Sequence, residues 1–101
     1  MDAVKTEAQI KEEVKAVLKD RGAWHFMPHM NGYGRSGIPD FIVCYRGRFI
    51  AFETKRQGNK PTAWQNRELD AIGKAQGRAY VVYDAAFVVQ VLDAIDGETV
   101  F

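Results

Sequence analysis

Two short apolar segments on either side of Arg46-Gly47 constrain the fold more than any other part of the sequence. β-branched and aromatic residues dominate both segments, 41–45 and 49–52, and such segments joined by a turn dipeptide predict a β-hairpin. A two-residue loop sets the register so that Tyr45 pairs with Arg48. Both faces of this hairpin are apolar, so we expect both to be buried, as in a sheet with helices on its two sides.

Three polar residues gather at one end of the predicted hairpin. The register places Asp40 directly opposite Glu53, and Lys55 follows two residues later on the same face. Carboxylates on neighbouring strands repel each other unless a positive charge lies between them. Mg²⁺ accepts such oxygen ligands, and the backbone carbonyl of Thr54 would add another. With Lys55 beside a water activated by the cation, the combination favours phosphodiester hydrolysis; an ordinary surface ion pair is the alternative.

The order of these residues along the chain resembles a nuclease signature. Pro39-Asp40, twelve further residues and then Glu53-Thr54-Lys55 resemble the PD…(D/E)xK motif. Gly37-Ile38 before the aspartate, an early Glu7, and Trp64-Gln65 at the start of a later helix narrow the resemblance to the stand-alone VRR-NUC (virus-type replication-repair nuclease) domain. The resemblance covers nearly the whole chain. It implies an α/β fold with the restriction-endonuclease-like αβββαβα core, a mixed four-stranded sheet flanked by helices.

The resemblance also implies roles for two further residues. In the family an acid on the first helix completes the metal site, and Glu7 matches that position best, with Glu13 as the second choice. An acid in a first turn also offsets the helix dipole, which leaves a structural role open. The family carries a glutamine at the position of Gln65 that assists the site, whereas the spacing from Thr62 equally predicts a capping box. The implied catalytic set is Asp40, Glu53, Lys55, Gln65 and Glu7, and the implied metal ligands are Asp40, Glu53, Glu7 and the Thr54 carbonyl.

Periodicity and turn residues predict the other elements. Helices are expected at 6–21, 61–76 and 85–95, and strands at 23–27 and 78–83 in addition to the hairpin. The last helix has a broad apolar face, so we expect its excess, with Val100 and Phe101, to form a dimer surface. Trp64 is expected in the core, and Cys44 is expected to be a buried, inert thiol.

Length and composition indicate one domain, residues 1–101. No apolar stretch approaches the roughly 18 residues of a membrane span, and the N-terminus lacks the apolar centre of a signal peptide. The single cysteine fits a reducing compartment. We therefore expect an intracellular protein, in the cytoplasm of a bacterial host if its source is viral or bacterial.

Positive charge is concentrated around the motif, although the net charge is only +1. Between residues 35 and 60 the chain carries six basic residues against two acids, the proposed metal ligands. Such a segment supplies phosphate contacts, and we expect DNA to be bound by Arg35, Ser36, Arg56 and Lys60. A solvated basic surface with a plain glycine-rich connection is the alternative.

These features together predict a Mg²⁺- or Mn²⁺-dependent DNA endonuclease. One domain offers one site, so cutting both strands calls for a homodimer, and stand-alone family members act as Holliday-junction resolvases, which makes branched DNA the expected substrate. A site-specific, mismatch or flap endonuclease with the same chemistry is one alternative. A non-catalytic nucleic-acid-binding protein is the other, and its mark would be a decayed motif, which this sequence does not have.

Overall fold

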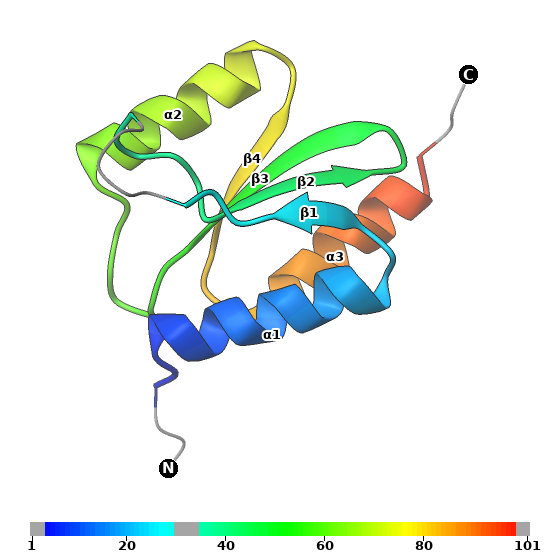
Figure 1. Cartoon of the computed structure of the whole chain (residues 1–101), viewed down its shortest axis with the longest axis horizontal. Coiled ribbons are helices and arrows are strands. Elements are labelled where there is room, and N and C mark those ends of the chain that lie inside the picture. The colour runs from blue at the N-terminus through cyan, green and yellow to red at the C-terminus, as the bar shows by residue number, and fades with distance from the viewer. Residues whose placement is uncertain (1–3, 30–34, 99–101) are drawn as a thin grey trace.

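The helices and strands follow one another in the predicted order α-β-β-β-α-β-α (Figure 1). The computed structural model describes residues 4–29 and 35–98. Its elements are α1 (Glu7–Asp20), β1 (Trp24–Phe26), β2 (Phe41–Tyr45), β3 (Arg48–Thr54), α2 (Ala63–Lys74), β4 (Arg78–Val82) and α3 (Ala85–Asp96). The expected α/β architecture with a mixed four-stranded sheet is confirmed.

The central hairpin has the predicted register. The strands lie in the order β1-β2-β3-β4, antiparallel from β1 to β3 and parallel between β3 and β4, which α2 connects. Tyr45 pairs with Arg48, and Phe41 pairs with Phe52. The turn residues Arg46-Gly47 both have positive φ, 49° and 79°, as a type I′ turn requires. The short loop therefore determines which side chains of both strands share a face.

The same capping box begins α1 and α2. In α1, the Thr6 hydroxyl accepts a hydrogen bond from the Gln9 amide (3.1 Å), and the Gln9 side chain accepts one from the Thr6 amide (2.8 Å). Thr62 and Gln65 repeat the arrangement in α2, at 3.2 and 2.8 Å. Each box satisfies two backbone N–H groups that have no partner inside the helix, which explains why the helices begin here.

One face of the sheet carries the core, and α1 and α3 cover it. The two helices lie beside each other in Figure 1 and contact each other. The fully buried residues on this side are Ile10, Val14, Leu18, Phe41, Val43, Ile50, Phe52, Val82, Val88, Leu92 and Ile95. Because alternate strand residues point the same way, all the sheet residues in this set belong to one face.

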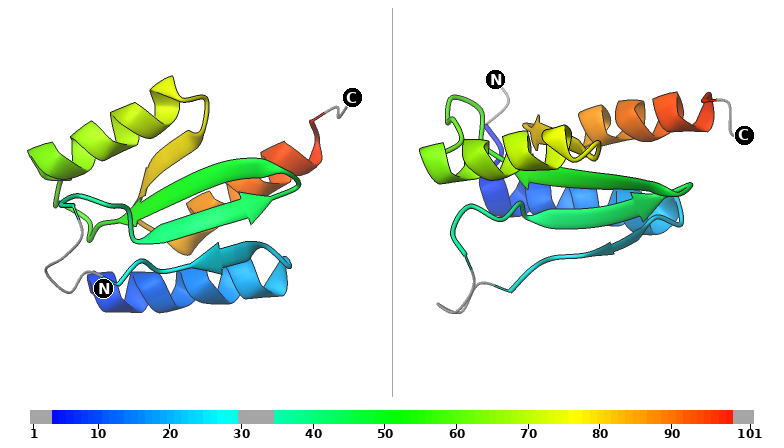
Figure 2. Two further views of the ribbon diagram at one scale, coloured as in Figure 1. Left: turned by 45° about the horizontal axis from the view of Figure 1, so that its top comes forward. Right: turned by 90° about the horizontal axis from the view of Figure 1, so that it is seen from above.

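The opposite face is only partly covered, so the expectation that both faces are buried is wrong. Figure 2 shows α2 across the sheet from α1, and α2 packs mainly on β4 and β3. One short helix cannot also cover β1 and β2, and Trp24 and Phe26 remain 62% and 47% exposed. Cys44 pairs with Trp24 on this open face and is exposed. The predicted buried thiol is therefore wrong as well.

The apolar face of α3 packs against the rest of the fold. The exposed apolar surface that was expected to form a dimer interface on this helix is therefore not found among its described residues. Val88, Val91, Leu92 and Ile95 are buried, and the half-buried ring of Phe87 packs edge-on against Tyr80, with ring centroids 5.6 Å apart. Val100 and Phe101 lie outside the described residues. None of the three helices described is long and apolar enough to cross a membrane.

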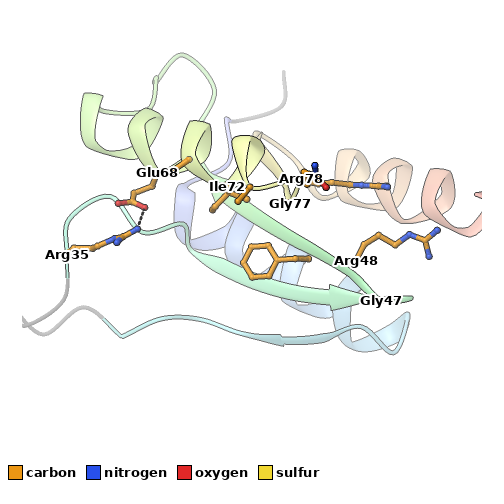
Figure 3. Close-up of a pocket in the computed structure, with 11 residues that line it drawn as sticks. Arg35, Gly47, Arg48, Glu68, Ile72, Gly77 and Arg78 are labelled. Carbon is orange, nitrogen blue, oxygen red and sulfur yellow. Dashed lines mark hydrogen bonds and ion pairs between the residues drawn. The ribbon is translucent and has the colours of Figure 1, made fainter.

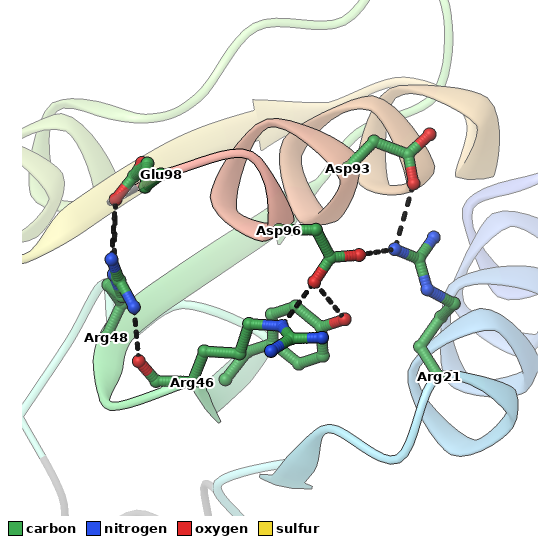
Figure 4. Close-up of polar contacts among 7 residues, drawn as sticks. Arg21, Arg46, Arg48, Asp93, Asp96 and Glu98 are labelled. Atoms are coloured by element: carbon green, nitrogen blue, oxygen red, sulfur yellow. Dashed lines mark hydrogen bonds and ion pairs between the residues drawn. The ribbon is translucent and has the colours of Figure 1, made fainter. Parts of the chain in front are cut away.

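Ionic contacts at the end of α3 hold the hairpin turn in place (Figure 4). Asp96 accepts hydrogen bonds from the Tyr45 hydroxyl (2.8 Å) and from Arg21 (2.7 Å), and it pairs with Arg46 of the turn. The hydrogen bond from Tyr45 and the pairing with the two arginines lower the pKa of Asp96, outweighing the opposing effect of burial. The network joins the last turn of α1, the hairpin and α3 at the end of the sheet remote from Asp40.

Candidate active site

Four segments meet at one end of the sheet. Figure 1 shows the start of β2, the end of β3 and the first turns of α1 and α2 at this end. Hydrogen bonds and ion pairs connect residues from all four segments. The residues predicted to be catalytic therefore come together, although they are far apart in the sequence.

Asp40 is held against the end of β3 by Thr54. Its Oδ2 atom accepts hydrogen bonds from the Thr54 amide (2.9 Å) and the Thr54 hydroxyl (2.6 Å). Its Oδ1 atom lies 3.5 Å from the Lys11 ammonium. The contacts seen for Thr54 are thus made through its N–H and hydroxyl, and the role expected of its carbonyl stays a prediction.

Glu53 is a buried carboxylate with one unused oxygen. The residue is only 2% exposed. Its Oε2 atom accepts a hydrogen bond from Gln65 Nε2 (2.7 Å) and lies 3.8 Å from Lys55 Nζ. Its Oε1 atom is buried and has no hydrogen-bond partner among the described residues. Buried polar atoms are rarely left unpaired, so this oxygen marks a place for a ligand.

Burial and neighbouring charge raise the pKa of Glu53 to about 7. Burial has the largest effect, and the negative charge of Asp40 adds to it, with a smaller contribution from Glu7. Lys55 acts in the opposite direction. Burial and the neighbouring carboxylates thus disfavour the ionised form of Glu53, and a bound cation would favour it.

Gln65 serves the helix cap and the carboxylate at once. Its amide oxygen accepts the hydrogen bond from the Thr62 amide, and its amide nitrogen donates to Glu53. The side chain therefore makes the predicted capping contact and also contacts Glu53, while its assistance to catalysis stays a prediction. The capping box holds Gln65 in the rotamer from which it reaches Glu53.

Glu7 lies beside the site, and Glu13 does not. Lys11 contacts both Glu7 (3.3 Å) and Asp40 (3.5 Å). Burial opposes a rise in the pKa of Lys11, but the two nearby carboxylates raise it. Glu13 instead pairs with Lys5 at 2.7 Å. Of the two acids considered for the first helix, the structure places only Glu7 near Asp40.

Lys11 and Glu68 are the polar residues at this end that the sequence analysis missed. Lys11 is four residues after Glu7, a spacing that brings helical side chains together and offers a usable signal. Glu68 is buried and pairs with Arg35 at 2.8 Å (Figure 3). Its position three residues after Gln65 put it on the same helix face, which is also readable from the sequence.

The residues expected to bind DNA lie around this end of the molecule. Arg35 and Ser36 are exposed next to the first turns of α2, and Arg56 and Lys60 are exposed in the connection from β3 to α2. The glycine-rich stretch 30–34 lies outside the described residues. The structure thus leaves these four side chains accessible to a large polyanion.

A hollow of about 630 Å³ extends from Arg35 and Glu68 along α2 to the hairpin turn (Figure 3). Its lining includes the apolar Phe49 and Ile72 and the basic Arg48 and Arg78. None of the predicted catalytic carboxylates lines it. The chemistry-bearing residues instead occupy an open end of the sheet, which suits a substrate as large as DNA.

The carboxylate oxygens of Asp40 and Glu53 fit a hard divalent cation that the protein binds on one side and the substrate on the other. Within residues 4–29 and 35–98 no three carboxylate, histidine or cysteine side chains converge to form a closed cage. Mg²⁺ typically binds through one or two carboxylates and completes its shell with waters and substrate phosphates. The unpaired Oε1 of Glu53 next to Asp40 is consistent with that requirement.

The fold and the clustered Asp, Glu and Lys define a restriction-endonuclease-like nuclease domain. No family model matches the chain, and no curated protein matches it. A solved structure described as a VRR_NUC domain is similar, with a TM-score of 0.72 and 26% sequence identity, over 94% of this chain and 99% of the other. The predicted resemblance to a stand-alone VRR-NUC domain is thereby confirmed.

Proposed function

We propose that this chain is a Mg²⁺- or Mn²⁺-dependent endonuclease that hydrolyses phosphodiester bonds in DNA, with residues 1–101 as a single nuclease domain. The observation that carries the proposal is the buried Glu53 carboxylate, which keeps an unpaired oxygen beside Asp40 and Lys55. A buried anionic oxygen with no partner is costly. A cation bound to this oxygen would remove the cost of burying it and would be placed where it can act on a phosphodiester.

Each residue has a distinct task in the proposed reaction. Asp40 and Glu53 would hold the metal ion, with Glu7 at the border of the site and the Thr54 carbonyl as a further candidate ligand. When bound, the ion supplies positive charge for the phosphate and lowers the pKa of a water. Lys55 places its ammonium beside Glu53, where it can orient the attacking water or stabilise charge on the phosphate.

Two neighbours keep the carboxylates in position. The bond from Gln65 holds Oε2 of Glu53 and leaves Oε1 available. Thr54 holds Oδ2 of Asp40 and leaves Oδ1 facing the cationic end of Lys11. Side chains fixed in this way bind a cation without first having to be ordered.

Branched DNA is the substrate we propose, cut by a homodimer that acts as a Holliday-junction resolvase. The exposed Arg35, Ser36, Arg56 and Lys60 favour contact with phosphates, which carry no sequence information. One site per chain cuts one strand, so a second copy supplies the second cut. The order of the motif residues, shared with stand-alone VRR-NUC domains, supports the same choice.

Cleavage of labelled DNA by isosteric variants tests the proposal. Glu53→Gln and Asp40→Asn keep the shape of the site and remove the charges, so each is expected to lower the Mg²⁺-dependent rate by at least about 100-fold. Glu13→Gln is the matched control, because Glu13 pairs with Lys5 away from the site. Full activity in Glu53→Gln would refute the mechanism.

Comparison of substrates separates the alternatives. Cutting of four-way junctions in preference to flaps and linear duplex supports a resolvase. Preferential cutting of mismatched, flapped or particular duplex sequences would instead identify the related endonucleases. Tight binding of DNA without cleavage in either Mg²⁺ or Mn²⁺ would identify a non-catalytic binding protein.

A further inference from the structure

Trp64 lies on the surface, not in the core where the sequence placed it. The residue is 57% exposed at the start of α2. The inward face of this part of α2 belongs to Gln65 and the buried Glu68. The backbone of Trp64 is nevertheless firmly packed, because a Cβ on Gly37 would come within 2.4 Å of its carbonyl group. The Trp64 indole is therefore exposed to solvent although its backbone is tightly packed.

A guanidinium group already covers part of this indole. Arg67, one helical turn further on, has its Cζ atom 5.1 Å from the centroid of the Trp64 ring. Within the part of the chain that the structure describes, no carboxylate pairs with Arg67. The charge of Arg67 therefore remains available to an anionic ligand, while the larger part of the indole remains open.

The pair lies on the first turns of the helix that contributes Gln65 to the proposed active site. Gln65, the next residue, bonds to Glu53. Trp64 and Arg67 also border a surface hollow of about 270 Å³. The other residues of this hollow are Arg35, Ser36, Glu68 and Ala71. A ligand in this hollow would thus reach both the stacked pair and the side chains expected to contact phosphate.

We propose that Trp64 and Arg67 form a platform on which an unpaired nucleobase of the DNA stacks, next to the phosphodiester that is cut. The proposal rests on the proposed nuclease function and specifies its substrate. Bases stack on aromatic rings and on arginine guanidinium planes without regard to sequence. Inside a continuous duplex both faces of a base are already stacked, so the platform selects DNA whose strands separate near the cut, as at a branch point.

The chemistry around Trp64 favours a nucleotide over a protein partner. Arg35, Ser36 and Arg67 border the same hollow as Trp64, and phosphates bind such groups; Arg35 also pairs with Glu68 there, and Arg67 has no acidic partner among the described residues. The other exposed tryptophan, Trp24, has a different setting: it packs edge-on against Phe26 at 5.6 Å on the open apolar face of the sheet. Trp24 is similarly exposed and lies near the hairpin turn, away from Asp40. It therefore provides a matched control.

Tryptophan fluorescence tests the contact directly, since the chain has two tryptophans. In Trp24→Phe the emission comes from Trp64 alone, and in Trp64→Phe it comes from Trp24 alone. Titration with a forked DNA that has two unpaired arms, in the metal-free protein, is expected to quench Trp64 and leave Trp24 unchanged. Unchanged emission from Trp64 at saturating DNA would overturn the proposal.

Abasic DNA shows whether a base is what binds. Replacing one nucleotide near the fork by an abasic residue keeps its phosphate, and at one position it is expected to weaken binding by about 5- to 150-fold, the effect of one stacked base. Trp64→Ala should weaken binding of intact DNA by a similar factor and be insensitive to that abasic position, whereas Trp64→Phe restores sensitivity. Additive effects of the abasic residue and Trp64→Ala would refute the platform.

The outcomes distinguish this proposal from the nuclease function. Cleavage by the wild-type protein, with binding and rate unaffected by Trp64→Ala, would overturn the platform alone. Quenching of Trp64 and loss of affinity at an abasic position, without cleavage of any DNA in Mg²⁺ or Mn²⁺, would support the platform and refute the nuclease.

Discussion

Two glutamines in identical capping boxes allow the contribution of one hydrogen bond to be measured. Gln65→Ala removes a bond from the Thr62 amide and a bond to the buried Glu53 carboxylate. Gln9→Ala removes the equivalent bond from the Thr6 amide and, in the described structure, no contact with an acid. The changes in helix propensity and in the cap are thus matched, and the difference between the variants reports the bond to Glu53.

The expected difference is large for a single side chain. An exposed cap bond contributes about 0.5–1.5 kcal/mol, whereas a bond to a charged group contributes about 1.5–3 kcal/mol. We therefore expect Gln65→Ala to lower the free energy of unfolding by about 2 kcal/mol more than Gln9→Ala. For a domain of this size, each kcal/mol corresponds to roughly 4–8 °C in Tm.

Urea denaturation in metal-free buffer at pH 8, where Glu53 is ionised in the folded protein, measures this difference. Equal losses of stability in the two variants would refute the idea that Gln65 supports the carboxylate. Gln65→Glu adds a second test, because glutamate preserves the cap but places a second negative charge beside Glu53. We expect it to remove nuclease activity, and retention of activity would contradict the assigned orientation of Gln65.

Three further variants probe other features. Lys11→Met removes a positive charge beside Glu7 and Asp40, so calorimetric titration should show Mg²⁺ binding about 2- to 5-fold tighter. Weaker binding would mean that Lys11 positions the ligands instead of competing with the ion. The lowered pKa of Asp96 stabilises the fold above the ordinary value of 3.8, and this contribution is lost as the pH falls through the lowered pKa. Asp96→Asn should therefore reduce the urea midpoint at pH 7 and flatten its decline below about pH 4, and an unchanged acid dependence would exclude this role. The exposed Cys44 should react with a maleimide in the native protein, and Cys44→Ser should change the free energy of unfolding by less than about 0.5 kcal/mol; protection of the thiol until the protein unfolds would show that it is buried.

Local geometry made the hairpin and the site predictable. A two-residue turn at Arg46-Gly47 leaves one register for the flanking strands, so the pairing of Tyr45 with Arg48 followed from the turn alone. The same register predicts that Asp40 lies near Glu53, without any information from tertiary contacts. Sequence spacing is sufficient here because the turn determines which residues are neighbours.

Burial was harder to predict, because it depends on what covers each face. The apolar strands predicted two buried faces, but α2 reaches only β3 and β4, and Cys44 and Trp24 stay open. The sequence could not decide between a capping and a catalytic position for Gln65 for another reason: one amide has two polar atoms, and its oxygen contacts the helix cap while its nitrogen donates to Glu53. Ion pairs such as Arg35 with Glu68 join residues 33 positions apart, beyond any local pattern.

The tight contact at Gly37 has a mechanical consequence. This residue, with a φ of +84°, leaves no room for a side chain against the backbone of Trp64 and Gln65. The loop that leads to Asp40 and the helix that carries Gln65 are therefore in close backbone contact, so a displacement of one presses directly on the other. If the proposed function is correct, a DNA strand bound to the outer surface of α2 would therefore act on the positions of Asp40 and Gln65 together.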